Sequence, residues 1–161
     1  MTGATPTWLK YLVTSGGLGL IPRAPGTWGS SAGIPLFWGI SVVSPNILGR
    51  AAILLLLTIL SYFFIQKYED ITGQHDDQRI VLDETIAFSW VLLPFPFSIE
   101  AVVFSFLWFR CFDVWKPGPI GWIDRHWKGA RGTLGDDLVA ALFSIFFTKL
   151  SLLVFYEFPI F

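Results

Sequence analysis

The chain has 161 residues, the length of a single domain, and residues 1–161 are treated as one unit. Hydrophobic residues make up 53% of it and charged residues only 14%, whereas soluble domains carry about 25% charged residues. The net charge of −1 provides no basic surface for phosphate backbones, which excludes a nucleic-acid-binding protein. The lone Cys111 excludes a disulfide framework and a cysteine-based zinc site.

The mean hydropathy of +0.60 and the aromatic share of 17% indicate a protein whose solvent is partly lipid. A very apolar soluble domain buried in an oligomer is the alternative.

The first apolar segment, 33–43, is too short to span a bilayer alone. The second, 51–65, reaches spanning length if the flanking Arg50 and Lys67 extend to the membrane interface.

The third apolar run, 85–109, is interrupted by Pro94 and Pro96. Because proline breaks helices, this run predicts two helices joined by a turn. Ser98 is positioned to cap the second helix, with Glu100 in its first turn.

The fourth run, 138–156, spans a membrane if Lys149 is tolerated near a helix end or faces protein.

Three polar, glycine- and proline-rich connections, 14–33, 66–84 and 110–137, contain almost all the acidic residues. Neither strict alternation nor hairpin turns are visible, so we predict an all-α, multi-helical membrane protein whose polar loops gather into one site. Positive charges occur at nearly every connection, so counting them does not decide the membrane orientation.

Acidic residues stand in pairs where apolar helices are predicted to begin. Asp83 and Glu84 form one pair, Asp136 and Asp137 form the other, and Asp113 lies in the third connection. One acid at a helix start is explained by capping, but a second adjacent acid adds repulsion unless a cation neutralises it. Two pairs together with Asp113 therefore favour a hard divalent cation, and Mg²⁺ takes such oxygen ligands.

A carboxylate-rich Mg²⁺ site beside a membrane suggests phosphate chemistry on a lipid. Zinc is disfavoured because His75 and His126 are the only histidines. Arg110 and Lys116 flank Asp113 and are candidates to bind the phosphate. Arg110 is equally well explained by an ion pair within its helix or by a place at the lipid interface.

The glycine-rich stretch 16–33 is the remaining polar segment. Gly26 allows close backbone approach, and Thr27 and Ser30 lead toward an apolar helix, where free N–H groups form an anion site. The stretch lacks the Gly-Lys-Ser/Thr of a Walker A motif. A plain re-entrant turn is the alternative to a phosphate cradle.

Four ordered blocks, which cover residues 16 to about 145, resemble those of the phosphatidylglycerophosphatase A family. They are PRAPGTWGSSAGIP, HDDQRIVLDE, FRCFDVWKPGPIGWIDR and GTLGDDLVAA. The resemblance implies an all-helical, multi-pass, Mg²⁺-dependent lipid phosphatase of the bacterial inner membrane. Such an enzyme hydrolyses phosphatidylglycerophosphate to phosphatidylglycerol and inorganic phosphate.

Carried over residue by residue, the family pattern falls on Asp83, Glu84, Asp113, Lys116, Asp136 and Asp137, and with weaker claims on His75, Asp76, Asp124, Thr27 and Ser30. Ala87 and Ala141 stand where relatives can carry glycine, which removes no ligand.

These observations lead to a hypothesis for the mechanism. One or two Mg²⁺ ions are held by some of Asp83, Glu84, Asp113, Asp136 and Asp137. Arg110, Lys116 and the 26–31 backbone hold the phosphoryl oxygens. Asp83, Asp137 and Asp76 are the candidate catalytic acids, with a proton handled by Asp76 or by one member of a pair.

Two alternatives come from other classes of function. Another lipid-headgroup enzyme is one, but the Asp-Gly that opens the CDP-alcohol phosphotransferase motif is missing, as is the Lys-x6-Arg-Pro of the two-histidine lipid phosphatases. A non-enzymatic membrane carrier is the other, and it predicts acids in the middle of helices. Only Glu100 approaches such a position.

Overall fold

The computed structural model describes residues 5–74 and 77–157, and within these ranges every regular element is a helix. The elements in chain order are α1 (Thr7–Val13), the 3₁₀ turn η1 (Leu18–Leu20), α2 (Pro25–Val43), α3 (Ile47–Thr72), α4 (Leu82–Leu92), α5 (Ile99–Trp115), α6 (Pro119–His126) and α7 (Ala130–Glu157). The predicted all-α fold is confirmed for the described residues.

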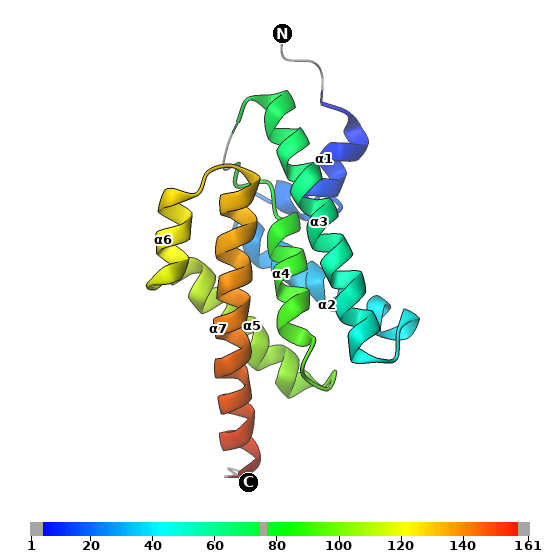
Figure 1. The fold of residues 1–161 in the computed structure, drawn as a ribbon, viewed down its shortest axis with the longest axis vertical. Coiled ribbons are helices and arrows are strands. Elements are labelled where there is room, and N and C mark those ends of the chain that lie inside the picture. The colour runs from blue at the N-terminus through cyan, green and yellow to red at the C-terminus, as the bar shows by residue number, and fades with distance from the viewer. Residues whose placement is uncertain (1–4, 75–76, 158–161) are drawn as a thin grey trace.

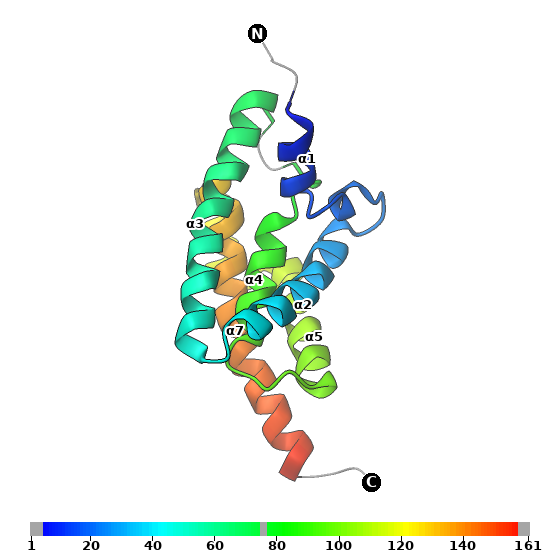
Figure 2. The same ribbon diagram turned by 90° about the vertical axis from the view of Figure 1, so that its right-hand side faces the viewer.

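Helix α4 is the centre of the bundle. It contacts α2, α3, α5 and α7, and the two longest helices, α3 and α7, lie on either side of it (Figure 1). Apart from Leu82, Glu84 and Trp90, every residue of α4 is buried. The main hydrophobic core consists of side chains from α2, α3, α4, α5, α6 and α7. The view from the side shows α2 and α5 crossing α4 on the face away from α3 (Figure 2).

The predicted division of the third apolar run is confirmed. Helix α4 ends at Leu92, just before Pro94, and α5 begins at Ile99. The Ser98 hydroxyl accepts a hydrogen bond from the Ala101 amide at 3.3 Å, which makes Ser98 the N-cap, and Glu100 lies in the first turn.

Two helix starts differ from prediction. Helix α2 begins at Pro25 rather than near residue 33, because proline at the first helical position costs no hydrogen bond and presets the backbone. Helix α7 begins at Ala130 rather than 138. Its N-terminus is held by Glu69 of α3, whose Oε2 accepts a hydrogen bond from the Ala130 amide at 3.1 Å. Both shifts convert expected loop into helix.

Helices α3 and α7 are long and apolar enough to cross a membrane, with 26 and 28 residues. At 1.5 Å per residue these lengths are about 39 and 42 Å, against about 30 Å for a hydrocarbon core. Only 11% and 22% of their most apolar windows are buried inside the protein. A core helix of a soluble domain would be mostly buried, so the outer faces of α3 and α7 need another apolar environment.

A second, smaller core closes one end of the bundle. Leu9 and Val13 of α1 pack with Ile65 of α3 and with Ala130 and Leu134 of α7. This cluster fixes α1 and the beginning of α7 at the same end of the bundle (Figure 1).

Candidate active site

A pocket of about 420 Å³ opens at this end of the bundle. Its walls come from the starts of α2 and α4, the end of α5, α6 and the first two turns of α7, so segments far apart in sequence meet here. Its lining includes Gly26, Asp83, Glu84, Arg110, Asp113, Lys116, Asp124, Asp136 and Asp137. The three polar connections therefore do converge, as predicted.

Asp83 and Glu84 occupy the first turn of α4. The residue at the N-cap position is Val81, and no side chain caps this helix. Asp83 is 2% exposed, and its Oδ1 has no hydrogen-bond partner. Oε2 of Glu84 is likewise buried without a partner. Capping therefore does not account for this pair.

Burial and neighbouring carboxylates disfavour the charged forms of both acids. Desolvation, followed by repulsion from Glu84, raises the pKa of Asp83 well above its usual range. Desolvation, followed by repulsion from Asp113, raises the pKa of Glu84 to about 7, with Arg110 opposing the rise. Both groups are thus poised to take up either a proton or a cation.

Asp136 and Asp137 lie in the second turn of α7 rather than at its N-terminus. Because α7 starts six residues earlier than Asp136, neither acid can cap it. Asp137 is 3% exposed, and its Oδ2 has no hydrogen-bond partner. The second pair, like the first, places an unpartnered carboxylate oxygen inside the protein.

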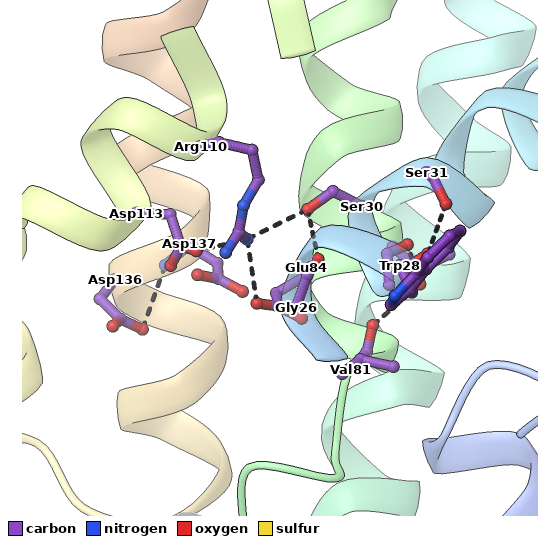
Figure 3. A network of polar contacts seen from close by, with 12 residues as sticks. Gly26, Trp28, Ser30, Ser31, Val81, Glu84, Arg110, Asp113, Asp136 and Asp137 are labelled. Carbon is purple, nitrogen blue, oxygen red and sulfur yellow. Dashed lines mark hydrogen bonds and ion pairs between the residues drawn. The ribbon is translucent and has the colours of Figure 1, made fainter. Parts of the chain in front are cut away.

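Arg110 links three elements of the site (Figure 3). Its Nη1 donates to Oδ2 of Asp113 at 2.6 Å and to Oε1 of Glu84 at 3.2 Å. The same atom reaches the Ser30 hydroxyl of α2 at 3.3 Å. The predicted i, i+3 pair within α5 is confirmed. Since the guanidinium also bonds to α2 and α4, it belongs to the pocket rather than to the lipid interface.

Lys116 terminates α5 in a left-handed conformation, with φ of 47°. Its Nζ donates to Oδ2 of Asp136 at 2.6 Å and to Oδ1 of Asp124. The hydrogen bonds to these carboxylates raise the pKa of Lys116 despite its partial burial. A non-glycine residue in this conformation is strained by about 1–2 kcal/mol, which the two ion pairs offset.

The glycines of the 16–33 stretch serve helix packing. A Cβ on Gly29 would lie 2.5 Å from Cβ of Val81, and one on Gly33 would lie 2.7 Å from the Thr85 carbonyl oxygen. A Cβ on Gly26 would collide with the Glu84 carboxylate. The glycine stripe therefore lets α2 approach α4 closely enough to seat the Asp83–Glu84 turn.

The remaining predicted residues are distributed unevenly. Gly26 lines the pocket, and Ser30 is buried with its hydroxyl on Arg110 and on the Gly26 carbonyl. Thr27 lies in the first turn of α2 but is not part of the pocket lining. His75 and Asp76 lie outside the described residues.

Several contributors to the site were missed at the sequence level, among them Glu69, Trp127 and Thr133. Glu69 is fully buried and holds the start of α7. Its signal was an acid on the same helical face as the core residue Ile65, four positions earlier. Trp127 and Thr133 line the pocket but carried no signal, because their places follow from the path between α6 and α7.

The donor set fits a hard divalent cation. Among the described residues, two basic side chains, Arg110 and Lys116, line the pocket with Asp83, Glu84, Asp113, Asp136 and Asp137, and Asp83 and Asp137 are paired with neither of them. Buried carboxylates without a partner are costly unless they are protonated or bind a cation. Within residues 5–74 and 77–157, no three acidic, histidine or cysteine side chains already converge as the ligands of a metal ion do.

An all-helical bundle with oxygen ligands and two basic groups around one pocket is suited to a phosphorylated ligand. Comparison with known sequences identifies the group: the chain belongs to the phosphatidylglycerophosphatase A family, whose family model matches residues 11–152. The predicted family is confirmed.

Two curated relatives carry the name phosphatidylglycerophosphatase A. The Escherichia coli (strain K12) protein is 40% identical over 129 residues, which cover 80% of this chain and 74% of that protein. The Haemophilus influenzae protein is 36% identical over 141 residues, which cover 85% of this chain and 84% of that protein. No solved structure matches the chain significantly.

Proposed function

We propose that this protein hydrolyses the terminal phosphomonoester of phosphatidylglycerophosphate, releasing phosphatidylglycerol and inorganic phosphate in a Mg²⁺-dependent reaction at a bacterial inner membrane. The observation that carries the proposal is the pocket in which Asp83 and Asp137 leave buried carboxylate oxygens unpartnered beside Arg110 and Lys116. The names of the two relatives supply the substrate.

The position of the pocket along α7 supports a lipid substrate. Asp137 precedes Glu157, the last residue of α7, by 20 positions, a rise of about 30 Å along the helix. This distance equals the hydrocarbon thickness of a bilayer, so a membrane-spanning α7 holds Asp137 at one headgroup layer. The phosphate of a lipid lies in the same layer.

The basic residues of the pocket bind the phosphoryl group. Arg110 offers a planar guanidinium and Lys116 a compact ammonium, and each forms an ion pair with a carboxylate of the pocket. Their charges favour the phosphoryl oxygens, on which negative charge accumulates during transfer. Ser30 orients Arg110 from α2 and acts as a positioning residue.

Asp83 and Asp137 would hold the cation, with Glu84, Asp113 and Asp136 as further ligands. When bound, Mg²⁺ supplies neutralisation of the phosphoryl oxygens and lowers the pKa of a water.

The chemistry requires that a water oxygen bonds to phosphorus while the bond from phosphorus to the glycerol oxygen breaks. The departing glycerol oxygen needs a proton. Glu84 can donate that proton when it does not bind the cation, because burial raises its pKa to about 7.

The test is phosphate release by the purified protein in mixed micelles. Phosphatidylglycerophosphate is expected to be hydrolysed with Mg²⁺ and not after EDTA treatment, and phosphatidic acid is expected to be a poorer substrate. Asp137→Asn should abolish release, and Asp70→Asn, an exposed acid on α3 outside the pocket lining, is the matched control. Undiminished turnover in EDTA would contradict the metal dependence, and full activity of Asp137→Asn would contradict the site.

A further inference from the structure

Exposed side chains at the pocket end are layered like those of a membrane interface. Along α5, Val103, Leu107 and Val114 are exposed on one side of the helix. This apolar stripe ends at Trp115, which is 75% exposed, and at Trp122 of α6. Tryptophan collects where hydrocarbon gives way to headgroups, so these two side chains mark that boundary.

The same sequence of layers recurs on the opposite side of the bundle. Helix α3 exposes Leu56 and Phe63 and then reaches Lys67, whose Nζ lies 5.5 Å from the centre of the Trp8 ring of α1. Trp8 also packs edge-on against Phe64. Here too an apolar stripe ends at a tryptophan, and the basic Lys67 lies beside it.

Helix α6 has the character of an interfacial helix. The helix packs on α7, and its buried residues are Ile120 and Gly121, whereas Trp122 and Arg125 are exposed. The side chain of Asp124 is turned to Lys116. The outward surface of α6 is therefore aromatic and basic, the combination that binds anionic headgroups.

Folding sorts the basic residues between the two ends. Of the eleven Lys and Arg residues, Arg110 and Lys116 face the pocket. Seven of the others lie on α1, α6, the C-terminal half of α3, the first turn of α7 and the connections next to these elements and to α4, namely Lys10, Arg23, Lys67, Arg79, Arg125, Lys128 and Arg131. The last two, Arg50 in the first turn of α3 and Lys149 in the C-terminal half of α7, belong to helix segments that point away from α1 and α6 (Figure 1).

We propose that α1, α6 and the basic segment 125–131 form a headgroup-binding surface that docks on the anionic phospholipids of the cytoplasmic leaflet, so that the pocket opens to the cytoplasm. Lys and Arg concentrate on the cytoplasmic side of membrane proteins, and the anionic leaflet attracts each such residue near its surface. The proposal rests on the membrane placement of the proposed function but not on its chemistry.

Cysteine labelling tests the orientation without reference to activity. In a Cys111→Ala background, Lys128→Cys probes the pocket end, and Pro45→Cys probes the turn between α2 and α3. An impermeant maleimide should label the Pro45→Cys variant in intact spheroplasts and the Lys128→Cys variant only in inverted vesicles. The reverse pattern, or labelling of either cysteine from both sides, overturns the proposal.

The same preparations separate this proposal from the proposed function. Loss of the protein from the membrane fraction overturns the membrane placement itself. Inverted labelling with intact phosphate release in detergent overturns only the orientation.

The lipid contact is tested by the thermal unfolding midpoint of the purified protein in neutral detergent. Added phosphatidylserine should raise the midpoint more than added phosphatidylcholine does, because a ligand of the folded state stabilises it. The double variant Arg125→Gln/Lys128→Gln should lose most of this difference. The matched variant Arg50→Gln/Lys149→Gln, at the other end, should keep it. Equal effects of the two lipids, or equal losses in the two variants, overturn the headgroup contact.

Discussion

Replacing Glu84 with glutamine should change how the stability of the metal-free protein depends on pH. Burial raises the pKa of Glu84 from 4.5 to about 7, so the folded protein keeps this proton over a range in which the unfolded chain has released it. The contribution of Glu84 to stability is therefore complete below pH 4.5 and falls as the pH rises to 7. A span of about 2.5 pH units at about 1.4 kcal/mol per unit corresponds to about 3 kcal/mol.

Glutamine resembles the protonated acid and has no charge to bury. We expect Glu84→Gln and the original protein to have similar free energies of unfolding at pH 4.5, and the variant to be more stable by about 3 kcal/mol at pH 8. The measurement is unfolding by titration with a denaturing detergent, followed by circular dichroism in the presence of EDTA. Glu100→Gln, which removes an acid at the other end of the bundle, is the control.

A difference between Glu84→Gln and the original protein that does not change between pH 4.5 and pH 8 would refute this reasoning. So would the same pH-dependent gain in Glu100→Gln, because the effect would then follow from net charge rather than from the pocket. With Mg²⁺ in place of EDTA, the deficit of the original protein at pH 8 should shrink, since a bound cation stabilises the ionised carboxylates.

Three further predictions follow from the contacts in the pocket and beneath it. Asp83→Asn should reduce phosphate release by at least about 100-fold while leaving the helical circular dichroism spectrum unchanged, and a smaller loss would remove Asp83 from the proposed ligand set. Lys116→Met should lower the free energy of unfolding by about 3 kcal/mol at pH 8, because it leaves the buried Asp136 carboxylate without its ion pair. Adding Asp136→Asn should recover most of that loss. Additive losses in the double variant would show that the two residues are uncoupled. Gly33→Ala should lower the unfolding midpoint by an amount equivalent to about 1–3 kcal/mol, because its Cβ would lie 2.7 Å from a carbonyl oxygen of α4. Ser31→Ala, on the exposed face of α2, is the control and should leave the midpoint unchanged.

Local signals in the sequence predicted several features of the fold correctly. The uncharged run at 51–65 became the centre of α3, and the two prolines with Ser98 divided α4 from α5. These features follow from neighbours in sequence, because caps, proline breaks and helical periodicity act within one or two turns. The starts of α2 and α7 were placed too late, since glycines and polar residues in those segments suggested loop.

The start of α7 shows why such signals fail. Its first amide is bonded to Glu69, which lies 61 residues earlier in the chain, and Gly132 and Gly135 admit the Trp127 backbone and ring. The glycines near the start of α2 likewise mark close packing on α4 rather than a flexible loop. A partner distant in sequence supplies the hydrogen bond or the packing contact that the local sequence does not reveal.

The candidate site divides in the same way. The sequence by itself determined the chemistry available to this protein: two adjacent acid pairs, Asp113 and the flanking Arg110 and Lys116, all beside apolar helices. Only the tertiary structure decided which acids are neutralised by a basic side chain and which, Asp83 and Asp137, are buried with a carboxylate oxygen that has no partner. It also brought most of the basic residues outside the pocket to one end of the bundle. Composition sets what groups a chain carries, but the energy of a buried charge depends on its distances to other charges, and those distances exist only once the helices have packed.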